Sequence, residues 1–284
     1  MSVVGSFDDT RAARAYANWV QHPGLLEHPT QPERSYFLCG TPRSGTWLLS
    51  GLLASSGVAG RPHEWFLPEV ETRCREEWNV DTPAGYLQRV LLAGTTPNGV
   101  LGVKLMWGYL GSLLARLGRQ DVPAAPTSPA HAYSGRLVAR AHEPVRTSAL
   151  PQITRHFPNP QFVWIQRQDV TAQAVSWAKA LQTQRWQHWG DPVQAPVYNR
   201  EQVAALLDNI AAGEAGWRGW FFSNEIEPVK VSYEDLAADT VGVAGGVVQA
   251  LGIAADAARF TQQTVKLTDD ANREWISRYR NGSD

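Results

Sequence analysis

The sequence predicts an α/β fold in which a parallel central sheet is covered by helices on both faces. Two observations support this fold class. Short apolar runs typical of buried strands occur at residues 36–39, 99–107, 161–166 and 228–233. Helix-like stretches separate these runs, and strands that alternate with helices along a chain form parallel βαβ units.

The first strand, its turn and the following helix form the most informative segment. The strand ends at Gly40, the chain turns through Thr41-Pro42-Arg43-Ser44-Gly45, and an apolar helix-like stretch begins at Thr46. Backbone N–H groups of such a turn and of the helix N-terminus point at one place, where the helix dipole favours an anion. The alternative interpretation is an ordinary strand-to-helix turn that contains two glycines.

The spacing of Gly40 and Gly45 matches the nucleotide-binding loop G-x-x-x-x-G-K-[ST], which predicts a P-loop-like nucleotide-binding fold. The lysine of that motif is missing because Thr46 directly follows Gly45, and the cation is Arg43 inside the turn. A loop without this lysine is poorly equipped for γ-phosphate transfer with magnesium. Arg43 and the loop amides can still hold a 5′-phosphosulfate, whose terminal group carries less charge.

Length and composition indicate one large domain, residues 35–284, preceded by an N-terminal extension and linker, residues 1–34. Hydrophobic residues make up 43% of the chain, which is sufficient for a sizeable core. The net charge of −1 provides no general attraction to nucleic acid or to an anionic membrane. Cys39 and Cys74 lack the paired spacing of a metal site, so we expect no metal.

The same features predict where the protein resides. The scarcity of cysteine suits a reducing cytoplasm, and the polar first residues do not resemble a signal peptide. No apolar run approaches the ~20 residues that cross a bilayer. We therefore expect a cytoplasmic protein without a membrane span.

Glycines and a proline predict that residues 57–66 form a loop that returns toward the first turn. This loop carries a guanidinium at Arg61, an imidazole at His63 and a carboxylate at Glu64. The carboxylate is either a functional group or one half of a structural ion pair with Arg61.

The segments that follow are a charged stretch, a helix and the second strand. Residues 69–78 are so rich in charge that we expect a mobile surface segment. Thr82 is expected to cap a helix over residues 83–92, which begins with a proline. Lys104 interrupts the apolar run 99–107, so it either reaches out from the end of the strand or points at an anion.

The third strand leads into Arg167 and then, after an N-cap at Asp169, into a helix expected over residues 170–186. Ser176 lies two turns into that helix. Arg167 and Ser176 can therefore converge at the carboxyl end of the sheet, where doubly wound folds bind ligands. Further helices are predicted at residues 198–222 and 239–251, with another at 110–117, and a long surface loop at residues 118–134.

These segments occur in the same order in one known family. The chain resembles the bacterial sulfotransferases that use 3′-phosphoadenosine 5′-phosphosulfate (PAPS), in particular the mycobacterial trehalose sulfotransferase group. The resemblance extends from about residue 36 to the C-terminus. The matching stretches include Thr41-Pro-Arg-Ser-Gly-Thr46, Gly57-Val-Ala-Gly60 with Glu64, Lys104-Leu-Met-Trp107, Arg167 with Gln173-Ala-Val-Ser176, Glu214 with Gly216-Trp217, and Arg278-Tyr-Arg280.

The resemblance implies a PAPS-dependent sulfotransferase whose catalytic domain is residues 35–284. The residues that bind the 3′-phosphate of the donor in this family correspond to Arg167 and Ser176. The proposed general base corresponds to Glu64, and Arg43 stabilises charge on the transferring group. The loop that binds the 5′-phosphosulfate corresponds to Thr41, Pro42, Arg43, Ser44, Gly45, Thr46 and the adjoining Trp47.

On the acceptor side, the resemblance implies a small hydroxylated molecule, namely a carbohydrate, a glycolipid or another natural product. His63 is the alternative base, because an imidazole titrates near neutral pH. The family also implies a homodimer that needs no metal. The candidate acceptor contacts are Arg61, Glu64, Trp65, Lys104 and Trp107.

Three residues depart from the trehalose sulfotransferase pattern, and all three lie on the acceptor side. Trp47 stands where those enzymes have a small hydroxyl residue, Arg61 replaces an acidic residue and His63 replaces a neutral amide. Two other classes of protein are alternatives. A nucleotide-dependent small-molecule kinase is disfavoured by the missing lysine, and a non-catalytic nucleotide- or sugar-binding protein is disfavoured by the retained Glu64.

Overall fold

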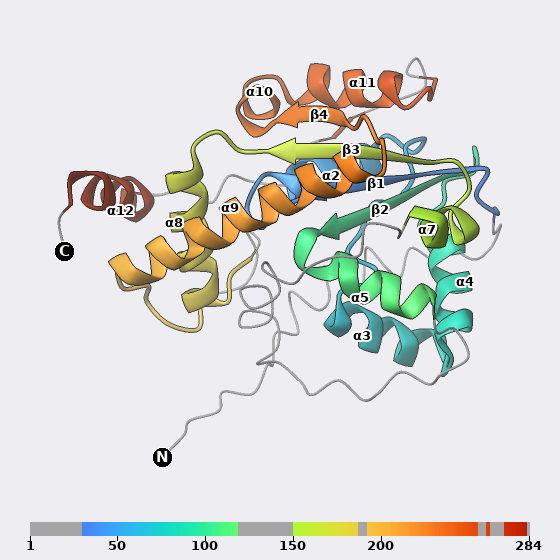
Figure 1. The fold of residues 1–284 in the computed structure, drawn as a ribbon, viewed down its shortest axis with the longest axis horizontal. Helices are drawn as coiled ribbons and strands as arrows, with labels where there is room; N and C mark the ends of the chain where they lie inside the picture. Colours follow the sequence, from blue (N-terminus) through green and yellow to red (C-terminus); the bar gives the residue numbers. More distant parts are fainter. Residues whose placement is uncertain (1–29, 119–149, 187–191, 255–259, 262–269, 283–284) are drawn as a thin grey trace.

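A four-stranded, all-parallel sheet forms the centre of the protein, with the strand order β2-β1-β3-β4 (Figure 1). This computed structural model describes residues 30–118, 150–186, 192–254, 260–261 and 270–282. The strands are β1 (Arg34–Gly40), β2 (Val100–Met106), β3 (Pro160–Gln166) and β4 (Val229–Ser232). Each strand lies on one of the apolar runs in the sequence, and the predicted α/β class is confirmed.

Helices cover both faces of the sheet, because successive side chains of a strand point to opposite sides. Phe37 and Cys39 of β1 belong to a core with residues of α3, α4, α5, α8 and α9, whereas Tyr36 and Leu38 belong to a core with α2 and α11. The helices are α2 (Thr46–Ser55), α3 (Pro68–Trp78), α4 (Pro83–Ala93), α5 (Trp107–Leu117), α7 (Leu150–His156), α8 (Val170–Thr183), α9 (Arg200–Ser223), α10 (Tyr233–Ala238), α11 (Thr240–Ala250) and α12 (Asp270–Asn281).

The helix boundaries follow local capping chemistry. The side chains of Thr82 and Asp169 accept hydrogen bonds from the backbone N–H groups of Gly85 and Ala172, so both predicted N-caps are confirmed. The structure ends α8 at Thr183, three residues before the predicted end. The reason is that Gln184 adopts a left-handed conformation, with φ of 54°, which stops the helix.

The charged stretch at residues 69–78 was predicted to be a mobile surface segment, and this prediction is wrong. The stretch lies in α3, which starts with a proline at its first position. Val70 and Cys74 are buried and Trp78 packs against the same core. Apolar residues spaced four apart form one buried face, and the charged residues occupy the rest of the helix.

The order of the strands determines where a site can form. From β1 the chain continues into α2, which packs on one face of the sheet, and from β3 it continues into α8, which packs on the other. β1 and β3 are neighbours, so their carboxyl ends, Gly40 and Gln166, lie side by side. Open α/β sheets bind ligands in the crevice at such a point.

Two expectations concern parts of the chain that the structure does not describe. Residues 1–29 of the predicted extension and residues 119–134 of the predicted surface loop lie outside the described ranges. Within those ranges, none of the helices combines the length and the hydropathy that a bilayer crossing requires.

Candidate active site

The turn between β1 and α2 has the backbone conformation that its glycines allow. Gly45 is in the left-handed region with φ of 99°, and a Cβ at this position would lie 2.6 Å from the ring of Tyr233. Arg43 also has a positive φ, 65°. No side chain caps the N-terminus of α2, which starts at the buried Thr46. The first N–H groups of α2 are therefore available to a ligand.

Ser44 carries the clearest sign of an anion site. Its hydroxyl is fully buried and has no hydrogen-bond partner among the described residues. Leaving a buried polar group without a partner costs about 1–3 kcal/mol. Because Ser44 lies beside the uncapped start of α2, the hydroxyl and the N–H groups fit an anionic group such as a phosphate or sulfate.

The two segments predicted to bind opposite ends of the donor meet in the structure. The Arg43 Nε donates to Ser176 Oγ at 3.0 Å, and its Nη1 donates to the backbone oxygen of Trp186 at 2.7 Å. Arg167 donates a longer bond, 3.4 Å, to the Arg43 carbonyl and lies over the Tyr233 ring. Arg43, Arg167 and Ser176 therefore form one basic cluster at the carboxyl ends of β1 and β3.

A hydrogen-bond network that the sequence did not predict connects the turn to α8 and α9. Thr41 Oγ1 donates to the Glu214 carboxylate of α9 at 2.7 Å, and Gln173 of α8 donates to the carbonyl of Pro42 at 2.8 Å. Burial raises the pKa of Glu214, although Thr41 and Gln166 donate to it. The only sequence signal for Glu214 was its place in a matching stretch, which does not reveal a partner 173 positions away.

Glu64, Lys104, Trp47 and His63 form a second cluster. Lys104 Nζ lies 3.3 Å from Glu64 Oε2 and 4.0 Å from the centroid of the Trp47 ring. The His63 ring contacts the same indole edge-on at 5.6 Å. Of the two interpretations of Lys104, the structure therefore supports the one in which it points at an anion, here the Glu64 carboxylate.

The alternative ion pair between Glu64 and Arg61 does not form. The Arg61 guanidinium donates instead to the backbone oxygens of Ala93 and Thr95, at the C-terminal end of α4. A cation is favourable there, since it interacts with the free carbonyl groups and with the helix dipole.

Burial changes the titration of this second cluster. It lowers the pKa of Lys104 to about 8, although the nearby Glu64 carboxylate counteracts the shift. Burial, together with the positive charge of Lys104, lowers the pKa of His63 to about 3. The imidazole is consequently neutral at physiological pH and is a weak base, which disfavours His63 as the general base.

The lowered pKa of His63 predicts that the free energy of unfolding falls as the pH is lowered. Between about pH 6.5 and pH 3 the unfolded chain binds a proton at His63 that the folded protein does not bind, so acid favours unfolding by up to about 1.4 kcal/mol per pH unit. Denaturant unfolding at about pH 7 and pH 5 should therefore show a larger loss for the wild type than for His63→Gln. Equal losses in the two proteins would contradict the assignment.

Both tryptophans that were predicted to contact an acceptor, Trp65 and Trp107, are core residues. Trp65 is fully buried and packs against His63 and Trp78. Trp107 is 8% exposed and packs edge-on against Trp217 of α9. Trp47 is more exposed than either of these two residues. Its ring contacts Lys104, which in turn pairs with Glu64.

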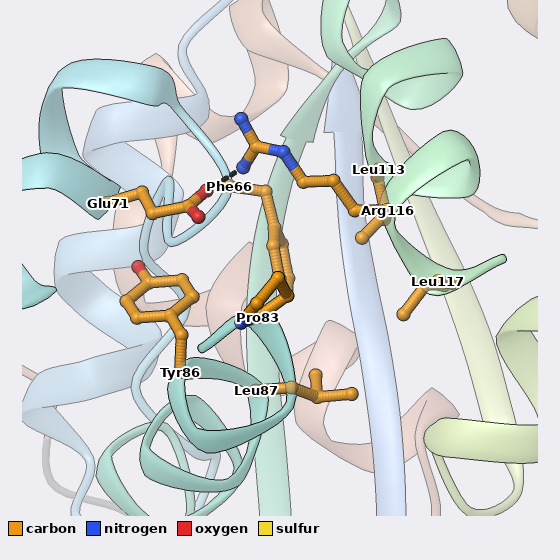
Figure 2. A pocket seen from close by; sticks show the side chains of 8 residues that line it. All are labelled: Phe66, Glu71, Pro83, Tyr86, Leu87, Leu113, Arg116 and Leu117. Carbon is orange, nitrogen blue, oxygen red and sulfur yellow. Dashed lines mark ion pairs between the residues drawn. The ribbon is translucent and has the colours of Figure 1, made fainter. Parts of the chain in front are cut away.

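A pocket between α3, α4 and α5 lies apart from these clusters (Figure 2). Its walls are largely apolar, and Glu71 pairs with Arg116 at one side. None of the predicted site residues lines it. Within the described ranges, no group of three or more acidic, histidine or cysteine side chains is placed to hold a metal ion.

The fold and the site define an α/β protein with a P-loop-like turn between its first strand and the following helix. The chain belongs to the Stf0 sulphotransferase family, whose profile matches residues 35–282. Membership of a sulfotransferase family leaves the kinase alternative without support.

Two similar proteins are trehalose 2-sulfotransferases. The one from Mycolicibacterium smegmatis is 31% identical over 90% of this chain and 96% of the relative. The one from Mycobacterium tuberculosis is 30% identical, over 87% of this chain and 94% of the relative. Among solved structures, a sulfotransferase from Alicyclobacillus acidocaldarius aligns with a TM-score of 0.45 and 13% identity, over 89% of this chain and 92% of that one.

Proposed function

We propose that the protein transfers the sulfuryl group of PAPS to a hydroxyl group of a carbohydrate, glycolipid or other natural product. Family membership supports sulfuryl transfer. The observation that carries the choice of donor is the buried Ser44 hydroxyl, which has no partner among the described residues and lies at the uncapped start of α2. A phosphosulfate would supply acceptor oxygens to this hydroxyl and to the N–H groups beside it.

Arg43, Arg167 and Ser176 provide the remaining donor contacts in this proposal. Arg43 leaves the turn that would hold the 5′ end of the donor and contacts Ser176 on α8. Arg167 has an Nε without a hydrogen-bond partner among the described residues. Two guanidinium groups and a hydroxyl suit a phosphate, because Arg binds such oxygens through several N–H groups at once.

Glu64 acts as the general base in the proposed reaction. PAPS supplies the sulfuryl group, and the Glu64 carboxylate accepts the proton of the acceptor hydroxyl as its oxygen attacks sulfur. Lys104, 3.3 Å away, holds this carboxylate in place. Arg43 stabilises the negative charge that moves from the sulfuryl group to the departing phosphate.

A sugar is the acceptor class that the site suits best. The relatives are named as trehalose 2-sulfotransferases. The Trp47 ring, which Lys104 links to Glu64, offers a flat surface for a sugar. Because Arg61 binds carbonyl groups of the α4 end, its charge is not directed at Glu64. The homodimer and the cytoplasmic location implied by the resemblance stay predictions.

The direct test of donor binding is the variant Ser44→Ala. We expect its affinity for 3′-phosphoadenosine 5′-phosphate, measured by calorimetry, to be roughly tenfold or more below that of the wild type, as hydrogen bonds to charged groups contribute about 1.5–3 kcal/mol. Its stability should be unchanged or higher, since the variant removes an unsatisfied buried hydroxyl.

Ser55→Ala, at the opposite end of α2, is the matched control and should bind as the wild type does. Unchanged affinity in Ser44→Ala would contradict the donor site. Mass spectrometry of reactions with PAPS and a panel of hydroxylated acceptors, starting with trehalose, then identifies the acceptor. If the nucleotide binds but no sulfated product forms, the non-catalytic alternative holds.

A further inference from the structure

Glu214 connects the two segments that carry the proposed donor site. One carboxylate oxygen accepts a hydrogen bond from Thr41 Oγ1 at 2.7 Å, and the other accepts one from Gln166 Nε2 at 2.9 Å. Thr41 is the first residue of the turn after β1, and Gln166 immediately precedes Arg167 at the end of β3. A single side chain therefore contacts both strand ends.

The directions of these hydrogen bonds fit an ionised carboxylate at position 214. Gln173 Nε2 donates to Thr41 Oγ1 at 2.9 Å, so the hydroxyl oxygen is used as an acceptor and its proton is directed to Glu214. The amide nitrogen of Gln166 is also a donor. A carboxylate offers two acceptor oxygens to these two donors, whereas an amide offers one acceptor and one donor.

The packing of α9 brings Glu214 and the turn into this contact. A Cβ at Gly213 would lie 2.8 Å from Thr41 Cγ2, so a larger residue here would have to displace the Thr41 side chain. One turn further along, Trp217 Nε1 donates to the Gly40 carbonyl at 2.9 Å. This short part of α9 thus supports the beginning of the anion-binding turn at three adjoining points.

We infer that Glu214 is a positioning residue that sets the distance between the anion-binding turn and Arg167, and thereby the fit of the doubly phosphorylated donor. The inference rests on the proposed function. Glu214 acts through Thr41 and Gln166, and its own carboxylate does not touch the donor. Its contribution should therefore be seen in donor affinity and in the KM for PAPS more than in kcat.

The sharpest test is a double-mutant cycle on the hydrogen bond between Glu214 and Gln166. In Glu214→Leu the donors of Thr41 and Gln166 lose their acceptor, and in Gln166→Leu the Glu214 carboxylate loses one of its donors. Each variant should bind 3′-phosphoadenosine 5′-phosphate roughly tenfold more weakly or worse. The double variant removes both partners of this hydrogen bond, so its loss of affinity should be smaller than the product of the two single losses.

Glu201→Gln, on the exposed first turn of the same helix, is the matched control and should keep the wild-type affinity. A double variant whose loss equals the product of the two single losses would overturn the inference. So would single variants that keep the wild-type dissociation constant and differ only in binding stoichiometry, since this is the behaviour of a partly unfolded protein. A wild type that does not bind the nucleotide would overturn the proposed function itself, and this inference with it.

Discussion

Replacing Glu64 with glutamine is expected to lower turnover by at least about a hundredfold, because general base catalysis contributes roughly 10²–10⁴ to a rate. The amide keeps the size of the side chain and an oxygen that can face Lys104, but it cannot accept a proton. Binding of 3′-phosphoadenosine 5′-phosphate should stay near the wild-type value, because Glu64 is proposed to act on the acceptor hydroxyl and not to contact the nucleotide.

The buried lysine makes a stability control necessary. Removing one partner of a buried ion pair costs about 3–5 kcal/mol in other proteins. Here burial already lowers the pKa of Lys104 to about 8, so this lysine can lose its proton more readily than an ordinary one. Thermal unfolding of Glu64→Gln is measured together with turnover, and Glu76→Gln on the exposed side of α3 is the control. Near-normal turnover in the folded Glu64→Gln protein would remove Glu64 from the role of base.

The second large effect is expected for Arg43→Met. Methionine retains much of the aliphatic length but removes the charge, and loss of one group that stabilises developing charge costs about 3 kcal/mol, or roughly 100-fold in turnover. If Arg43 acts mainly on the transferring sulfuryl group, the affinity for 3′-phosphoadenosine 5′-phosphate, which lacks that group, should fall much less than kcat.

Steady-state kinetics and calorimetry on the same preparation separate these two quantities. Arg155→Met removes an exposed arginine from α7 and should leave both unchanged. Equal losses in nucleotide affinity and in turnover would assign Arg43 to the nucleotide end, where it already contacts Ser176.

The sheet and the turn between β1 and α2 could be predicted from the sequence because their signals are local. A strand that is buried on both faces is a continuous apolar run, and β1 and β2 are examples. The turn is marked by Gly40 and Gly45 at a fixed spacing. The N-caps at Thr82 and Asp169 depend on contacts with residues three positions away, so both could be predicted from the local sequence.

Other features depend on contacts between distant segments. The alternative interpretation of Glu64 paired it with Arg61, three residues away, whereas in the structure its partner is Lys104 of β2. Helix α3 was not predicted because most of its residues are charged, and its apolar face consists of only Val70, Cys74 and Trp78. Trp65 could not be distinguished from a surface indole, because composition does not show which side of a loop faces the core.

The support that α9 provides to the turn also has a consequence for biosynthesis. The turn is made early, but Glu214 and Trp217 leave the ribosome more than 170 positions after Thr41 and Gly40. A nascent chain that ends before α9 already contains the glycines and the contacts from α8, but it lacks the hydrogen bonds from Glu214 and Trp217 to the turn. The turn therefore gains its full set of supporting contacts late in translation, when most of the polypeptide has emerged.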